Sequence, residues 1–319
     1  MKRFITIAVS AVLILSGCAD ASPERVVTLV AHDSFAISDE SIAEFENQSG
    51  YRLEILRAGD AGSLTNRLVL TKQSPIGDVV FGIDNTLRGV ADENQIIDGS
   101  LTEVNYSDVC FNYDRLWFEQ NKIAPPTSWK DLTDPTYRGL TVVSNPLTSS
   151  PGLAFLATTV AGFGEDGFES YWRDLKANEV KVAAGWEEAY FTEFSGSAGP
   201  GSYPIVLSYS SSPAAEVRED GQPQTVALLD ECFRQIEYIG VLAGAPNKEG
   251  ANQLVEYLLS ESFQSTMPGL MYVYPVNQEA EIPSEWSEFG TMARSTIGEE
   301  LDIALNRSQW QDKWSAIFE

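Results

Sequence analysis

Residues 26–56 read VVTLVAHDSFAISDESIAEFENQSGYRLEIL. The run starts with an apolar strand at 26–31, and an amphipathic helix with Phe45 on its apolar face follows. Gly50 ends that helix, and a second strand follows at 53–56. A strand, a helix and a strand in this order predict a βαβ unit, whose two strands lie parallel in one sheet.

The same alternation continues and predicts an α/β fold. A second unit begins after a strand at 109–112, where Pro125 and Pro126 interrupt the rhythm, and the chain returns near 226–239. Further strands are predicted at 78–82, 140–143 and 205–209. Further helices are predicted at 87–97, 153–161, 251–262 and 301–318. Two more helices are indicated by their apolar residues, one by Leu64 and Leu68 and the other by Phe168, Tyr171 and Trp172.

A chain of 319 residues exceeds the usual size of one hydrophobic core, so we expect two lobes. Two passages of the chain between them would form a hinge. The predicted lobe 1 comprises residues 18–110 and 236–319, and lobe 2 comprises residues 111–235. Residues 1–17 precede both lobes.

The N-terminal segment predicts export. Lys2 and Arg3 precede an apolar run at 4–15, which is shorter than a membrane span and closes at Ser16-Gly17-Cys18. The sequence Leu-Ser-Gly-Cys resembles the lipobox of bacterial lipoproteins, which implies a signal peptide at 1–17 and acylation of Cys18. We therefore expect a lipoprotein held at the cell membrane on its extracytoplasmic side, with ordinary secretion as the alternative.

The composition is strongly acidic. The chain has 46 acidic and 21 basic residues and a formal charge of −25, which becomes −27 without residues 1–17 and their two basic side chains. Nucleic acid is therefore an unsuitable partner, and a cationic ligand suits the surface better than an anionic one.

Two cysteines remain after Cys18, namely Cys110 and Cys232. An exported protein meets an oxidising environment, so we expect these two residues to form a disulfide. Two separate buried thiols are the alternative. If both cysteines lie on the crossing segments, the disulfide would join the strands about which the lobes flex.

Several motifs resemble those of the type II periplasmic solute-binding proteins of ABC importers. PTSWKDL at 126–132 and LLSESFQ at 258–264 are general marks of that superfamily. Six further runs resemble its thiamine-binding branch: HDSF at 32–35, SLTNRL at 63–68, GIDN at 82–85, TSSPGL at 148–153, GWEEAY at 185–190 and VLSYSSSPA at 206–214. The resemblance implies two lobes, each a mixed sheet flanked by helices, and two crossover hinge strands.

The resemblance also implies a binding protein rather than an enzyme. It implies a small-molecule ligand, thiamine or a thiamine phosphate, and no cofactor. We expect a monomer that delivers its ligand to the membrane subunits of an ABC permease.

Thiamine is a flat aminopyrimidine joined to a cationic thiazolium, so its site needs aromatic faces and a carboxylate. Trp186 matches the stacking tryptophan of the branch, with core packing as the alternative. Tyr209 ends a strand where a helix begins, and the next three hydroxyls either meet the ligand or cap the helix. These hydroxyls belong to Ser210, Ser211 and Ser212.

Further contacts are implied on the other side of the site. Ser149 and Ser150 match a pair that meets the hydroxyl or phosphate end of the ligand, although helix capping competes. Asp60 and Ala61 match an acidic binding loop in which the glycine is displaced by one residue. His32 and Tyr272 replace a tyrosine and a tryptophan of the branch, and both keep a ring that can stack. The remaining predicted site residues are therefore Asp60, Ala61, Ser149, Ser150, His32 and Tyr272.

Four alternatives compete with this hypothesis. Ferric-iron binders use adjacent tyrosines, and the chain has no Tyr-Tyr pair. A structural zinc site needs clustered Cys and His, but the chain has a single His, so no metal site is expected. A hydrolase lacks a Gly-x-Ser-x-Gly motif here. A polyamine binder is the closest alternative, since it also combines aromatic walls with carboxylates.

Overall fold

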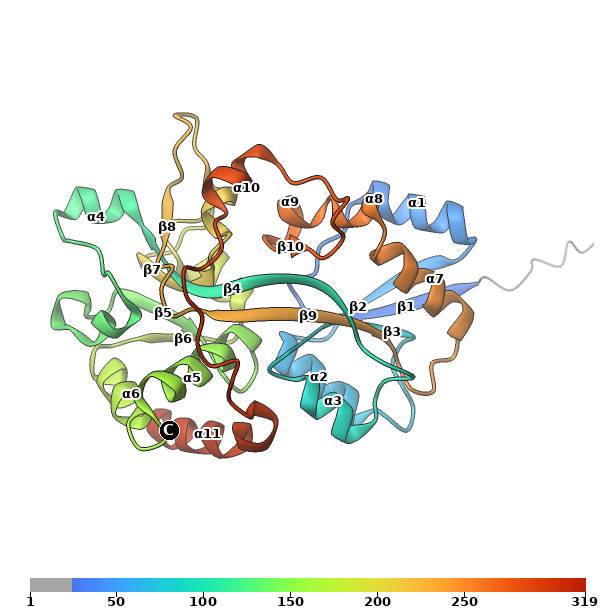
Figure 1. Ribbon diagram of the computed structural model, residues 1–319, viewed down its shortest axis with the longest axis horizontal. Helices are drawn as coiled ribbons and strands as arrows, with labels where there is room; N and C mark the ends of the chain where they lie inside the picture. The colour runs from blue at the N-terminus through green and yellow to red at the C-terminus, as the bar shows by residue number, and fades with distance from the viewer. Residues whose placement is uncertain (1–24) are drawn as a thin grey trace, which may run out of the picture.

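The computed structural model describes residues 25–319 (Figure 1). The predicted signal peptide at 1–17 and the predicted acylation at Cys18 lie outside the described residues. Among residues 25–319, none of the helices combines the length and the apolar character that a membrane crossing requires.

Lobe 1 is built on three parallel strands, with β1 between β2 and β3. The expected βαβ unit is present: Ser38 caps α1 by accepting a hydrogen bond from the Ser41 N–H, and Gly50 ends that helix in the left-handed conformation. The elements of lobe 1 are β1 (Val26–Ala31), α1 (Asp39–Ser49), β2 (Arg52–Arg57), α2 (Ala61–Leu70), β3 (Val79–Asp84), α3 (Arg88–Asn94), α7 (Lys248–Leu258), α8 (Glu261–Gln264) and α9 (Met267–Met271).

Lobe 2 repeats this design around β5, which lies between β6 and β7 in parallel pairing. The buried helix α5 packs against this sheet. The elements of lobe 2 are α4 (Arg115–Asn121), η1 (Trp129–Thr133), η2 (Pro135–Tyr137), β5 (Thr141–Ser144), α5 (Ser150–Phe163), α6 (Phe168–Ala177), β6 (Lys181–Ala183), η3 (Glu188–Glu193), β7 (Ile205–Tyr209), η4 (Ser212–Glu216) and β8 (Thr225–Ala227).

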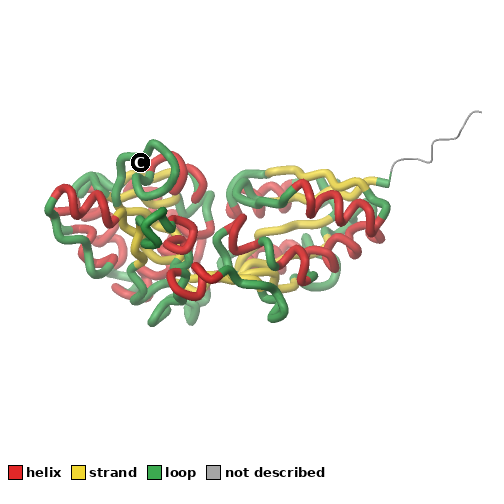
Figure 2. The backbone as a smooth tube through the Cα atoms, turned by 90° about the horizontal axis from the view of Figure 1, so that it is seen from above, coloured by secondary structure: helices red, strands yellow, loops and turns green. Residues whose placement is uncertain are grey.

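Two long antiparallel strands, β4 (Thr102–Asp114) and β9 (Phe233–Val241), run through both lobes. They join the lobes into one sheet of order β2-β1-β3-β9-β4-β7-β5-β6, and β10 (Tyr274–Pro275) pairs with β4. Figure 2 shows the two lobes with this strand ribbon between them. The two predicted crossovers are therefore β4 and β9.

The expected disulfide is present at the lobe 2 end of this ribbon. Cys110 lies on β4 and Cys232 directly precedes β9, and their sulfurs are 2.04 Å apart. The bridge therefore fastens the two hinge strands to each other, as expected if both cysteines lie on the crossing segments.

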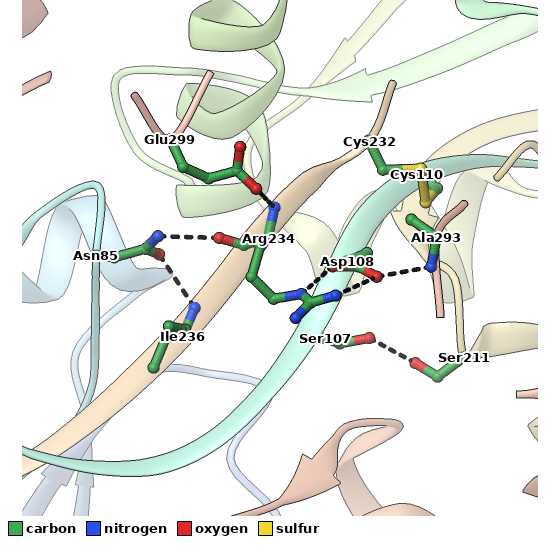
Figure 3. Close-up of polar contacts among 10 residues, drawn as sticks. All are labelled: Asn85, Ser107, Asp108, Cys110, Ser211, Cys232, Arg234, Ile236, Ala293 and Glu299. Atoms are coloured by element: carbon green, nitrogen blue, oxygen red, sulfur yellow. Dashed lines mark hydrogen bonds and ion pairs between the residues drawn. A yellow bond between two sulfur atoms is a disulfide. The ribbon is translucent and has the colours of Figure 1, made fainter. Parts of the chain in front are cut away.

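The C-terminal strap, residues 290–299, crosses the ribbon on one face (Figure 1, dark red). There the Asp108 carboxylate pairs with the Arg234 guanidinium and also accepts a hydrogen bond from the Ala293 N–H at 2.7 Å (Figure 3). The Arg234 N–H in turn donates to the Glu299 carboxylate at 2.9 Å. The strap therefore satisfies polar groups of both hinge strands.

The end of the chain corrects one part of the predicted organisation. The predicted lobe 1 includes all of residues 236–319, but α10 (Ser284–Phe289) packs beside η4 of lobe 2. Helix α11 (Ile303–Phe318) packs on α6 of lobe 2 and also contacts α3 of lobe 1. Trp314 of α11 meets Trp172 of α6 edge to face at 5.9 Å. An amphipathic pattern predicts that a helix is buried on one face but does not say against which partner.

Candidate functional site

A narrow space lies between the lobes, on the face of the ribbon that does not carry the strap. This inner chamber is lined by His32, Ser34, Asp60, Ser150, Pro151, Trp186, Tyr209, Glu237, Met271 and Val273. Only about 20 Å³ of it is open to the centre of a water molecule, which corresponds to roughly one water.

The inner chamber adjoins a wider space of about 460 Å³, the outer cleft. Ser34 and Asp60 line both. The other residues of the outer cleft are Asp33, Gly59, Ser63, Thr148, Ala184, Gly185, Glu187, Glu188, Phe191 and Thr192. A ligand therefore has a wide approach that leads to a tight, aromatic end.

Asp60 joins the two lobes. Its Oδ1 caps α2 by accepting from the Ala61 N–H at 2.6 Å, and its Oδ2 accepts from the Trp186 N–H of lobe 2 at 2.8 Å. A Cβ at Gly185 would lie 2.6 Å from Asp60 Oδ2, so this approach requires glycine. Burial raises the pKa of the Asp60 carboxyl, and the two backbone hydrogen bonds offset part of that rise.

Trp186 is the centre of an aromatic cluster. Its ring stacks on Tyr190 at 5.1 Å, and the Tyr209 ring lies tilted at 5.8 Å. The indole N–H donates to Ser208 Oγ at 2.8 Å, which fixes the ring. Tyr190 and Phe191 belong to η3, a π-helical turn of the kind often found at functional sites. The cluster offers an aromatic face beside the Asp60 carboxylate.

His32 forms an ion pair with Glu237, a residue of the hinge strand β9. His32 Nε2 lies 3.2 Å from Glu237 Oε1, although without hydrogen-bond alignment, and Ser34 Oγ lies 2.9 Å from His32 Nδ1. Burial disfavours a charged imidazole, but the Glu237 carboxylate outweighs that cost and raises the pKa of His32. Burial likewise opposes ionisation of Glu237, yet His32 keeps the pKa of this carboxyl lowered.

Comparison with known proteins identifies the family. The sequence profile of the family described as "Bacterial extracellular solute-binding protein" matches residues 82–288. The chain belongs to this family.

Three relatives extend that result. The "Thiamine-binding periplasmic protein" of Salmonella typhimurium is 26% identical and covers 95% of this chain and 96% of its own. The solved structure of a "Periplasmic thiamin binding protein" aligns with a TM-score of 0.79 at 26% identity, over 93% of this chain and 97% of that one. "Iron uptake protein A1" of Synechocystis sp. is 20% identical over 86% of this chain and 82% of its own.

This solute-binding protein therefore has the predicted fold of the type II periplasmic binding proteins. Family membership makes it the solute-binding component of an ABC importer. It also confirms the prediction that the chain is not an enzyme.

The structure brings most of the predicted site residues of this solute-binding protein to one place. Asp60, Ser150, Trp186, Tyr209 and His32 line the inner chamber. Ala61 contributes its N–H to Asp60.

The other predicted serines lie behind the lining of the chamber. Ser212 Oγ pairs with Ser208 Oγ at 2.8 Å, and Ser211 Oγ donates to the Tyr272 carbonyl at 2.6 Å. Within the part of the chain that the structure describes, the buried hydroxyl of Ser210 has no hydrogen-bond partner. Ser149 lies close enough to the Asp60 carboxylate to favour its ionised form. Two of the predicted serines thus support the fold around the site, Ser149 interacts with Asp60, and Ser210 keeps an unused hydroxyl.

Tyr272 does not line the chamber, but its neighbours Met271 and Val273 do. It ends α9 with a left-handed backbone, φ 60°, and its ring lies 6.0 Å from that of Trp186. It therefore backs the aromatic cluster from lobe 1.

Sequence reasoning missed Glu237. The residue lies in a strand whose first positions alternate between buried and partly exposed, and its side chain is buried. The available signal in the sequence was a glutamate among the apolar residues of this strand. A carboxylate buried there needs a charged or hydrogen-bonding partner, which would have marked Glu237 as a candidate site residue.

Proposed function

We propose that this solute-binding protein captures thiamine, or one of its phosphates, between its lobes and presents it to an ABC permease. The observation that carries the proposal is the meeting of Trp186 and Asp60 from opposite lobes. An aromatic face and a carboxylate are the two groups that a flat thiazolium cation requires. The relative from Salmonella typhimurium and the protein of the solved structure are both thiamine-binding proteins by name, which supports the same ligand.

Ligand entry requires the lobes to part, because the inner chamber has almost no free volume. In the structure the lobes are joined by the Asp60 to Trp186 hydrogen bond and by the Ser63 N–H, which donates to the Thr148 carbonyl at 3.1 Å. A ligand that contacts both lobes stabilises the closed form by its differential affinity for that form. The permease would then recognise the closed form.

Isothermal titration tests the ligand. The chain from residue 19 onward, unfolded and refolded to remove bound ligand, would be titrated with thiamine, its phosphates, hydroxymethylpyrimidine, spermidine and ferric citrate. We expect one-to-one binding of thiamine. If thiamine gives no heat while ferric citrate binds, the assignment passes to the iron-binding branch and the thiamine proposal fails.

A polyamine is the second candidate, because Asp33, Asp60, Glu187 and Glu188 line the outer cleft. An extended polycation could use several of these carboxylates at once. Competition distinguishes the two ligands: spermidine should not displace bound thiamine at equal concentration if the aromatic end of the site sets the affinity.

We also propose that Cys18 is acylated and holds the protein, as a monomer, at the outer side of the cell membrane. In cells grown with a labelled fatty acid, the full-length protein should carry label and sediment with membranes. The Cys18→Ser variant should lose both properties. A wild-type protein found unlabelled in the soluble fraction would show ordinary secretion instead.

A further inference from the structure

We propose that Ser34 selects the ligands of this site, by donating a hydrogen bond from its hydroxyl to an acceptor atom of the ligand. Ser34 belongs to the run HDSF at 32–35 but is absent from the predicted site residues. It lines both the inner chamber and the outer cleft, so a ligand in either space lies beside it. This role rests on the proposed function and adds one hydrogen bond, with its direction, to that site.

The Ser34 hydroxyl is bonded to His32. Ser34 Oγ lies 2.9 Å from His32 Nδ1, and the turn between them is closed by the Phe35 N–H, which donates to the His32 carbonyl at 3.1 Å. A hydroxyl has one hydrogen, and in a hydrogen bond only one of the two partners supplies the hydrogen. The direction of the Ser34 hydroxyl therefore depends on whether His32 Nδ1 is protonated.

Strand β3 holds the His32 ring in one orientation. A Cβ at Gly82 would lie 2.0 Å from His32 Cδ2, so the ring occupies space that a glycine leaves open. The Phe81 ring lies tilted against the imidazole, with the two centroids 5.9 Å apart. This packing keeps Nδ1 toward Ser34 and Nε2 toward Glu237.

The Nε2 atom of His32 carries a hydrogen in every protonation state of the ring. Glu237 Oε1 lies 3.2 Å from Nε2, both side chains are only 8% exposed, and Glu237 Oε2 accepts from Asn105 Nδ2 at 2.7 Å. A bare Nε2 would set its lone pair against those of a buried carboxylate, which is unfavourable. A neutral His32 therefore keeps its single hydrogen on Nε2, and only Nδ1 gains or loses a proton.

The charges around the ring favour the protonated form of Nδ1. The titratable groups around His32 and Glu237 are Glu237 itself, Asp60, Asp33, Asp84 and Tyr209. Burial opposes a charged imidazole, but the Glu237 carboxylate, followed by Asp60 and Asp33, outweighs that cost and raises the pKa of His32. Burial raises the pKa of the Asp84 carboxyl to about 7 and that of the Tyr209 phenol well above its usual value, so these two groups are neutral more often than usual.

A charged His32 directs the Ser34 hydrogen to the ligand. With both ring nitrogens protonated, Nδ1 donates to Ser34 Oγ, and the Ser34 hydrogen is left for another acceptor. Once Nδ1 loses its proton the roles reverse, because Ser34 then donates to Nδ1 and presents only lone pairs to the two spaces. The site therefore favours a ligand with an acceptor atom at Ser34, and it does so while His32 is charged.

Nuclear magnetic resonance tests the state of His32. The chain from residue 19 onward, without a histidine tag, contains a single histidine, so the imidazole signals of a ¹⁵N-labelled sample need no assignment. Spectra between about pH 5 and 9, with and without thiamine, should show both ring nitrogens protonated at neutral pH and the hydrogen of any neutral fraction on Nε2. Glu237→Gln should lower the pKa of His32. A ring that is neutral at neutral pH, or a neutral fraction with its hydrogen on Nδ1, overturns the proposal.

Isothermal titration with thiamine tests the hydrogen bond. Below the pKa of His32, Ser34→Ala should bind thiamine about fivefold more weakly than wild type, because one hydrogen bond is lost. Ser34→Thr keeps the hydroxyl and should restore the affinity to within about twofold. The ratio of the wild-type to the Ser34→Ala affinity cancels the titration of thiamine itself. This ratio should fall toward one as the pH rises through the pKa of His32 measured in the complex.

The outcomes separate this proposal from the proposed function. If wild type and Ser34→Ala bind thiamine equally at every pH, or if Ser34→Thr fails to restore the affinity, the Ser34 hydroxyl does not select the ligand. An affinity ratio that stays constant while the spectra show His32 to titrate also overturns the proposal, because a merely structural serine would act alike at every pH. Circular dichroism should show each variant folded. If thiamine does not bind the wild type, the proposed function itself fails.

Discussion

The two faces of the β4–β9 ribbon differ in how their polar groups are satisfied. On the strap face, Asp108 accepts from both Arg234 and the Ala293 N–H, and the disulfide lies next to this pair (Figure 3). On the cleft face, Asn105 Oδ1 and Gln235 Oε1 are buried and have no partner within residues 25–319. The same two strands thus carry a closed polar network on one face and open hydrogen-bonding capacity on the other.

This difference separates stability from binding within one structural element. A buried charge that loses its partner destabilises the fold strongly, so the strap face should control unfolding. Unpaired polar groups near a cleft cost stability but remain free for a ligand or for water. Changes on the two faces should therefore have separable effects on the free energy of unfolding and on affinity.

Removal of the disulfide should have the largest effect on stability. The bridged residues are 122 positions apart, and a loop of that size corresponds to about 4 to 5 kcal/mol in the chain-entropy model. In urea denaturation, the double variant Cys110→Ser/Cys232→Ser should have a free energy of unfolding lower by that amount. Its affinity for thiamine should change little. If this variant lost most of its affinity for thiamine while its free energy of unfolding stayed the same, the assignment of stability to the strap face and of binding to the cleft face would be wrong.

Asp108→Asn should have the second-largest effect on stability. It leaves the Arg234 guanidinium beside a neutral amide and weakens the hydrogen bond from the Ala293 N–H of the strap. The Asp108 side chain is fully buried but that of Arg234 is 37% exposed, so breaking this half-buried pair should cost about 2 kcal/mol, less than a fully buried pair. Asp230→Asn is the matched control, since Asp230 forms a bidentate pair with Arg294 in which both side chains are more than half exposed. That control should lose much less stability in chemical denaturation, because solvent screens an exposed pair. Equal costs at the two positions would contradict the distinction.

Trp186→Ala tests the cleft side. The loss of the aromatic face should weaken thiamine binding by about 2 kcal/mol, or roughly 30-fold, in isothermal titration. Trp186→Phe keeps a ring and loses only the hydrogen bond to Ser208, so it should retain most of the affinity. Circular dichroism should show both variants folded. Unchanged affinity in Trp186→Ala would remove this residue from the site.

The smallest expected effect is the pH dependence of the His32–Glu237 pair. The pKa of Glu237 is lowered from 4.5, so its contribution to stability is present above pH 4.5 and is lost as the pH falls through the folded-state pKa. The pKa of His32 is raised from 6.5, so its contribution is complete below pH 6.5 and is lost as the pH rises through the folded-state pKa.

Glu237→Gln should therefore reduce the free energy of unfolding most between about pH 4.5 and 6.5. Urea denaturation of wild type and variant across pH 3.5 to about 8.5 measures this window. A difference between the two proteins that stays constant with pH would show that the pair contributes no charge interaction.

Much of the molecule followed from local sequence patterns. Alternation of period two and period 3.6 predicted the strands and helices, and the exported context predicted the disulfide between Cys110 and Cys232. Trp186, Tyr209 and Asp60 were predicted from short runs that resemble a known branch, and the structure brings all three to the inner chamber. These features depend on neighbouring residues, so a linear sequence contains them.

Only the tertiary structure decided which distant groups meet. Glu237 is part of the site because β9 places it beside His32, which lies 205 residues earlier in the chain. Helix α11 packs on lobe 2 through the contact of its Trp314 with Trp172 of α6. Tyr272, at the left-handed end of α9, lies behind the aromatic cluster. Such contacts depend on strand register and on which faces pack together, and neither is encoded within a single stretch of sequence.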